Sequence, residues 1–133
     1  ILLGTHVLRK GSDHDTYLQA QRVRALLAQQ LAAILQGPRI LVTPTAPTAA
    51  FRQGERLHDP LAMFLADVYT VPANLAGLPG LSLPCGFTEQ PLPVGLQLVG
   101  PPFSEARLLG AAWAYQQATG WHLCRPPLAE EAP

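Results

Sequence analysis

The sequence predicts an α/β fold in which helices flank a small sheet. The chain has 133 residues, of which 48% are hydrophobic, so it can bury a core and is too apolar for a disordered tail. A helical pattern over residues 13–36 is followed directly by a β-branched run over 39–43, and two more strand-like runs precede a last helical stretch. This alternation is typical of a sheet covered by helices.

The first predicted element is a helix over residues 13–36, a stretch that contains no proline or glycine. Ser12 is placed to cap its first turn, with Asp15 three residues later as a partial capping box, and Gly37-Pro38 ends it. The apolar residues at helical spacing are Val23, Leu27, Leu31 and Ile34.

A buried strand is predicted over residues 39–43, because this run is short, β-branched and bounded by prolines. It leads into a rigid loop, whose two prolines hold the residues before them extended. Binding sites of α/β folds form at strand ends, so the hydroxyls of Thr43, Thr45 and Thr48 are candidates for a site. The favoured alternative is that these hydroxyls satisfy the loop's own backbone.

The middle of the chain predicts two short helical segments. A helix is predicted over residues 60–68, with Asp59 as its N-cap and Pro60 at its first position. The residues at its C-terminal end are mostly apolar. The predicted apolar face of this helix consists of Leu61, Phe64, Leu65 and Val68. A further helical turn should end at Gly77, with the side chain of Asn74 bonded to its backbone.

The last elements are two strands, over 81–84 and 94–99, and a helix that starts at Ser104 as its cap. The polar loop between the strands predicts a hairpin, and the helix should run to Thr119. Its apolar face consists of Leu108, Ala112 and Tyr115.

Several features suggest that the chain is a fragment. Three strands are few for a stable sheet, and the chain begins at Ile1 inside an apolar run without methionine. Charged residues make up only 14%, against about 25% in typical domains. Part of the surface should therefore pack on another polypeptide or on a further part of the same protein. We therefore expect residues 1–133 to be part of one domain, with 126–133 as a flexible tail.

Composition excludes several classes of function. The chain has 9 Lys and Arg against 9 Asp and Glu, so it has no electrostatic footprint for nucleic acid or an anionic membrane. No apolar run approaches the roughly 20 residues that span a bilayer. The spacing of Cys85 and Cys124 and of the four histidines fits no metal site, and the cysteines predict a reduced, cytoplasmic protein.

No residue of this chain qualifies as a catalytic nucleophile. There is no G-x-S-x-G turn, Ser82 alternates with leucines as in a strand, and Ser104 is interpreted as a helix cap. Cys85 lies between Pro84 and Gly86, with no helix start to lower the pKa of its thiol, so a structural role is favoured.

Asp67 is the candidate binding residue. It lies among apolar neighbours at a predicted helix end, where an unpaired buried carboxylate would be costly. A structural cap or an ion pair with an arginine is the favoured explanation from the residues alone. The functional alternative is a carboxylate that receives a substrate ammonium group.

Five motifs, in this order, resemble the C-terminal third of amidase-signature enzymes, and among these the A subunits of aspartyl/glutamyl-tRNA amidotransferases. The motifs are TPTAPT (43–48), DPLAM (59–63), TVPANLAGLPG (70–80), LPCG (83–86) and LPVGLQLVG (92–100). The likeness extends over nearly all of residues 1–125. DPLAM together with Asp67 points to members that use glutamine.

The resemblance implies an α/β/α sandwich with a large mixed sheet, of which this chain is the C-terminal portion. The family's two serines and its lysine base would lie upstream, because Ser82, Ser104 and Lys10 do not match them. Asp67 matches the carboxylate that receives the α-amino group of glutamine. The arginine for the α-carboxylate would precede Ile1, and the fragment alone should be inactive.

The resemblance also implies the substrate and partners. Glutamine would be hydrolysed, and the ammonia would convert misacylated Glu-tRNA(Gln) or Asp-tRNA(Asn) with the help of the B and C subunits. ATP and Mg²⁺ would belong to the partner subunit and no cofactor to this chain, with tRNA contacted mainly through the partner. Two alternatives stay open: part of a generic amidase for other carboxamides, or a non-catalytic α/β interaction module.

Overall fold

A computed structural model describes residues 14–125 of the chain. The elements are α2 (His14–Ile34), β1 (Leu41–Pro44), α3 (Pro60–Leu65), α4 (Val71–Ala76), β2 (Gly80–Phe87), β3 (Pro93–Val99), α5 (Glu105–Ala118) and the 3-10 helix η1 (Trp121–Leu123). The order of helices and strands is the predicted one. The predicted Ser12 cap and the tail at 126–133 lie outside the described residues.

The three strands form an antiparallel sheet in the order β1-β3-β2. As predicted, β2 and β3 are joined as a hairpin, in which Ser82 pairs with Gln97. On the other side of β3, Thr43 of β1 pairs with Gln97 and Leu41 pairs with Val99. The described strands include no parallel pair, so the mixed character expected of the sheet is not found in this part.

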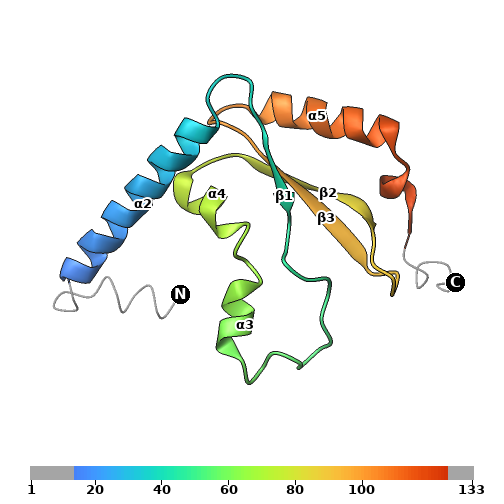
Figure 1. Ribbon diagram of the computed structural model, residues 1–133, viewed down its shortest axis with the longest axis horizontal. Helices are drawn as coiled ribbons and strands as arrows, with labels where there is room; N and C mark the ends of the chain where they lie inside the picture. Colours follow the sequence, from blue (N-terminus) through green and yellow to red (C-terminus); the bar gives the residue numbers. More distant parts are fainter. Residues whose placement is uncertain (1–13, 126–133) are drawn as a thin grey trace, which may run out of the picture.

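Helices cover both faces of the sheet (Figure 1). Successive residues of a strand face opposite sides, and β3 therefore contributes to two separate clusters. Leu98 packs with Leu83, and with Leu108 and Ala112 of α5. On the other face, Val99 belongs to a cluster of Leu35, Ala73 and Val99, which joins the end of α2 and α4 to the sheet. The expected α/β fold is thus confirmed, with helices packed on both faces of the described sheet.

Helix α3 begins as predicted but is shorter. The Asp59 carboxylate accepts a hydrogen bond from the Ala62 N–H at 3.0 Å, and Pro60 occupies the first position. The helix ends at Leu65, and residues 66–70 form turns. The N–H of Asp67 bonds to the carbonyl of Phe64, three residues back, at 3.3 Å. This tighter spacing is typical of a helix that unwinds at its end.

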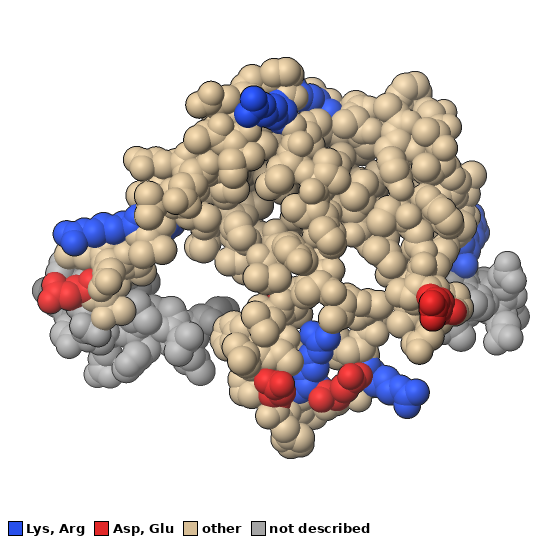
Figure 2. Space-filling model, in the orientation of Figure 1, with Lys and Arg blue, Asp and Glu red and all other residues tan. Residues whose placement is uncertain are grey.

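The apolar face predicted for α3 is not buried by the described residues. Phe64 is 77% exposed and Leu61 is 66% exposed. Val23 of α2 is likewise exposed, and so is Val42 of β1. Among the described strands β1 lies at the edge of the sheet, and it is not the buried strand that was predicted. Figure 2 shows that most of this face of the molecule carries no charged side chains. These exposed apolar surfaces fit the expectation that further polypeptide, from the same protein or from a partner, packs on them.

The predictions for the ends of α4 are confirmed, whereas the cap predicted for α5 is not found. Gly77 ends α4 in the left-handed conformation at φ 67°, and Asn74 Nδ2 donates to the Thr70 carbonyl at 3.0 Å, both as predicted. Ser104 occupies the N-cap position of α5 without capping it. Its hydroxyl donates to the Pro101 carbonyl at 2.6 Å, because the side chain is turned back into the preceding turn.

Candidate functional site

A polar row crosses the sheet on the face opposite α5. It consists of Thr43, Gln97 and Ser82, which stand side by side on β1, β3 and β2. Gln97 is only 6% exposed, and its side-chain nitrogen donates to Thr43 Oγ1 at 3.0 Å and to the Tyr69 carbonyl at 2.9 Å. Both amide hydrogens are therefore used.

Sequence reasoning did not single out Gln97. Its signal is a lone amide in the middle of the apolar run 94–99, where an unsatisfied polar group would be expensive. Such a residue predicts a buried partner. The partners, Thr43 and Tyr69, are distant in sequence and could not be identified from it.

The hydroxyls of Thr43, Thr45 and Thr48 bond to other side chains and not to the loop backbone, which corrects the favoured prediction. Thr45 Oγ1 lies 2.6 Å from Ser82 Oγ on β2. Thr48 Oγ1 accepts from Arg56 Nη2 at 2.9 Å, and Thr43 Oγ1 accepts from Gln97. The loop is held by these three side-chain contacts.

The same loop borders a hollow of about 520 Å³ on the polar side of the sheet. Residues 44–50 form one wall, and Ser82, Thr88 and residues 93–95 form the other. It presents hydroxyls and backbone groups but no ionisable side chain. This hollow can accept hydrogen-bonding groups, and it brings no acid or base to them.

Asp67 lies in the turn at 66–70 and is exposed. No hydrogen bond or ion pair joins its carboxylate to any described residue, so the cap or ion pair favoured by the sequence is not present in this part. The carboxylate is also not among the residues that line the hollow beside Ser82. It is connected to the sheet through Tyr69, two residues later, by the bond from Gln97.

The serines and cysteines among residues 14–125 have no base among their hydrogen-bond partners. Ser82 bonds to Thr45, Ser104 bonds to the Pro101 carbonyl, and half-buried Cys85 lies 3.5 Å from the Val94 carbonyl oxygen. A serine or cysteine nucleophile needs an adjacent base. The strand position predicted for Ser82 and the structural role predicted for Cys85 agree with this geometry.

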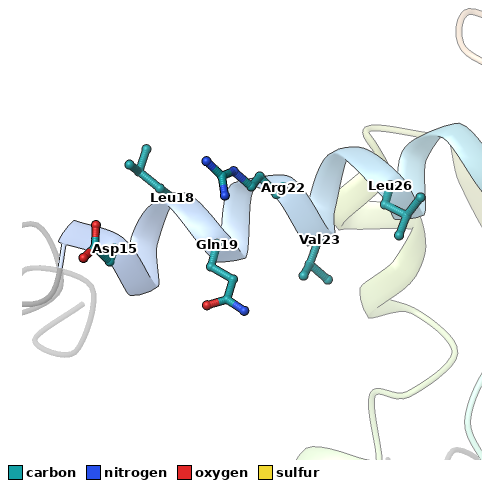
Figure 3. Close-up of a pocket in the computed structure, with 6 residues that line it drawn as sticks. All are labelled: Asp15, Leu18, Gln19, Arg22, Val23 and Leu26. Atoms are coloured by element: carbon teal, nitrogen blue, oxygen red, sulfur yellow. The ribbon is translucent and has the colours of Figure 1, made fainter.

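A second hollow, of about 560 Å³, follows the first half of α2. Figure 3 shows that its labelled residues, among them Asp15 and Arg22, all come from this one helix and point to different sides of it. It lacks a nucleophile and a convergent set of polar groups, so it is not an active-site candidate.

Metal-ligating clusters and membrane-spanning helices are both absent from the described part of the chain. Within residues 14–125, no group of three or more His, Cys, Asp or Glu side chains is arranged to hold a metal ion. Over the same range, none of the helices is both long enough and apolar enough to cross a membrane.

Comparison with known proteins identifies clear relatives. The chain is 57% identical over 129 residues to the A subunit of the glutamyl-tRNA(Gln) amidotransferase of Aromatoleum aromaticum, and 51% identical over 129 residues to the corresponding A subunit of Trichormus variabilis. Each match covers 97% of this chain and 26% of the relative. The chain therefore spans about a quarter of the length of these relatives.

Solved structures share the fold. The A subunit of the glutamyl-tRNA(Gln) amidotransferase of Thermotoga maritima matches with a TM-score of 0.68 and 39% identity, over 80% of this chain and 23% of that one. A 6-aminohexanoate cyclic dimer hydrolase matches with a TM-score of 0.74 and 25% identity, over 90% of this chain and 27% of that one. The model of the amidase family matches residues 1–109. With most of its length matched by that model, the chain belongs to the amidase family.

Proposed function

We propose that this chain is the C-terminal portion of the A subunit of a glutamine-dependent tRNA amidotransferase. The whole subunit would hydrolyse glutamine and supply the ammonia that converts misacylated Glu-tRNA(Gln) or Asp-tRNA(Asn). The observation that carries the proposal is the 57% identity over 129 residues to a subunit with that name. The chain's own part would be a wall of the substrate pocket and not the nucleophile.

The described residues support this division of labour. Their serines and cysteines have no base, so the nucleophile would come from the rest of the domain. The Asp67 carboxylate is exposed and has no partner among the described residues, so it is free to receive the α-ammonium group of glutamine. Charge-assisted hydrogen bonds of this kind are stronger than neutral ones.

The partners follow from the same proposal. The remainder of the amidase domain would cover apolar surfaces such as Phe64 and Leu61. The B and C subunits would receive the ammonia, hold most of the tRNA contacts and bind ATP and Mg²⁺, so this chain would need no cofactor. The complex would act in the cytoplasm.

The test compares two substrates in the full-length subunit, wild type and Asp67→Asn. We expect kcat/KM for glutamine to fall roughly 10- to 100-fold, because one charge-assisted hydrogen bond is lost. Hydrolysis of propionamide, which has no ammonium group, should be unchanged. The matched control is Asp15→Asn, another exposed aspartate, on α2. Equal activity of Asp67→Asn and wild type on glutamine would refute the role of this carboxylate.

A generic amidase is the second candidate. The observation that favours it is the TM-score of 0.74 to a hydrolase of a cyclic amide. In that case the wild-type subunit would hydrolyse propionamide and release no ammonia from glutamine. The same assay therefore separates the two functions.

A further inference from the structure

We propose that Gln97 is a positioning residue, whose side-chain amide holds the turn that carries Asp67 in its place against the sheet. This inference rests on the proposed function, since it assigns a use to the position of Asp67. The amide acts on the backbone of Tyr69 and on Thr43, and does not itself contact the substrate.

The two bonds of Gln97 join distant parts of the chain. Thr43 lies in β1, where the chain is about to leave the sheet, and Tyr69 lies just before α4, where the chain returns. Residues 45–69 between them form an excursion that contains α3, and Figure 1 shows it running away from the sheet and back. One amide nitrogen on the central strand therefore closes both ends of this excursion.

Other contacts hold the excursion together internally but do not attach its second half to the sheet. Arg56 donates to Thr48 Oγ1 at 2.9 Å and to the Ala62 carbonyl at 3.3 Å, and all three residues belong to the excursion. The Asp67 carbonyl accepts from the N–H groups of Thr70 and Val71, within the same turn and the start of α4. Among the described residues, the bond from Gln97 to the Tyr69 carbonyl is the hydrogen bond that joins residues 60–70 to the sheet.

Burial makes this attachment rigid. Gln97 is 6% exposed, so water cannot easily replace Tyr69 or Thr43 as a partner. If the amide is removed, the Tyr69 carbonyl loses its donor and the turn is free to shift. A carboxylate held in place binds an ammonium group more tightly than a mobile one, because less conformational entropy is lost on binding, so the loss should raise the KM for glutamine. An amide without an ammonium group should be unaffected.

The experiment uses the full-length subunit with Gln97→Met, which keeps the length of the side chain and removes both donors. The matched control is Gln90→Met, an exposed glutamine in the loop between β2 and β3. Hydrogen exchange should accelerate about tenfold at residues 66–71 in Gln97→Met, with exchange in β2 and β3 unchanged. The KM for glutamine should rise about tenfold, and kinetic constants for propionamide should stay within about twofold.

The outcomes are distinct. Unchanged exchange at 66–71, or an equal loss of activity on both substrates, would overturn the inference. If Gln97→Met does not fold, Thr43→Val is the second variant, because it removes the bond between Thr43 and Gln97 without changing side-chain shape. Hydrogen exchange at residues 66–71 should then accelerate to a smaller degree. Unchanged exchange at these residues would again overturn the inference. A wild-type subunit that does not hydrolyse glutamine would refute the proposed function instead, and exchange would still decide whether Gln97 holds the turn.

Discussion

The hydroxyl oxygens of Thr45 and Ser82 lie 2.6 Å apart, over a glycine of the strand between them. That residue is Gly95, whose carbonyl also accepts from the Thr45 N–H at 2.9 Å. A Cβ at position 95 would lie 2.7 Å from Thr45 Oγ1 and 3.3 Å from Ser82 Oγ. The contact between Thr45 and Ser82, one of those that hold the loop after β1, therefore depends on the absence of a side chain at Gly95.

Replacing Gly95 by alanine should separate the two hydroxyls and destabilise the protein. The expected loss in free energy of unfolding is about 1–3 kcal/mol, typical of a group forced into a space already occupied. Urea denaturation of the full-length subunit measures it. A Gly95→Ala variant as stable as the wild type would show that Thr45 can move aside at no cost.

Two other glycines should respond in opposite directions to the same change. Gly77 has φ 67°, so Gly77→Ala should cost about 1–2 kcal/mol by placing alanine in the left-handed region. Gly110 lies inside α5, and an added Cβ would meet no described atom within 4 Å beyond its chain neighbours and the backbone of its own helix, so Gly110→Ala should gain about 0.5–1 kcal/mol. The comparison of their urea midpoints checks both signs, and a shift in the same direction for both would contradict this reasoning.

Two neighbouring leucines of α5 test the core on that face of the sheet. Leu108 is almost fully buried against the sheet, and Leu108→Ala should cost about 2–5 kcal/mol. Leu109 is exposed, and Leu109→Ala should change stability by about 0.5 kcal/mol or less. Thermal unfolding of the two variants measures the difference. A similar loss at Leu109 would reveal that another part of the protein covers it.

The isolated 133-residue chain should release no ammonia from glutamine. Its described serines and cysteines have no adjacent base, and Ser82 and Ser104 already bond to Thr45 and to Pro101. An ammonia assay with the full-length subunit as positive control measures this. Activity in the purified chain that disappears with Ser82→Ala would overturn the assignment of the nucleophile to another part of the protein.

Elements bounded by local chemistry could be predicted from the sequence. Asp59 and Pro60 start α3, Gly77 ends α4, and the polar loop between two apolar runs forms the hairpin, because each signal acts over a few residues. The face of α5 that contains Leu108 was also predicted, since helical spacing alone defines it.

Contacts between distant residues could not be predicted. The hydroxyls of Thr43 and Thr45 bond to Gln97 and Ser82, which only the strand order brings beside them. The burial expected around Asp67 was wrong for a related reason: apolar neighbours in sequence do not bury a carboxylate when the described residues place nothing over the turn. Its role in binding stays a prediction.

The strand order β1-β3-β2 also sets a sequence of events during synthesis. β1 leaves the ribosome well before β3, because Leu41 precedes its partner Val99 by more than fifty residues in the sequence. The hairpin of β2 and β3 joins residues that are close in sequence. β1 cannot pair with β3 until the excursion, α4 and β2 have been made. Pairings between such distant residues form slowly, and unpaired strand edges invite aggregation in the meantime. Nascent chains that stop before residue 99 should therefore depend most on chaperones.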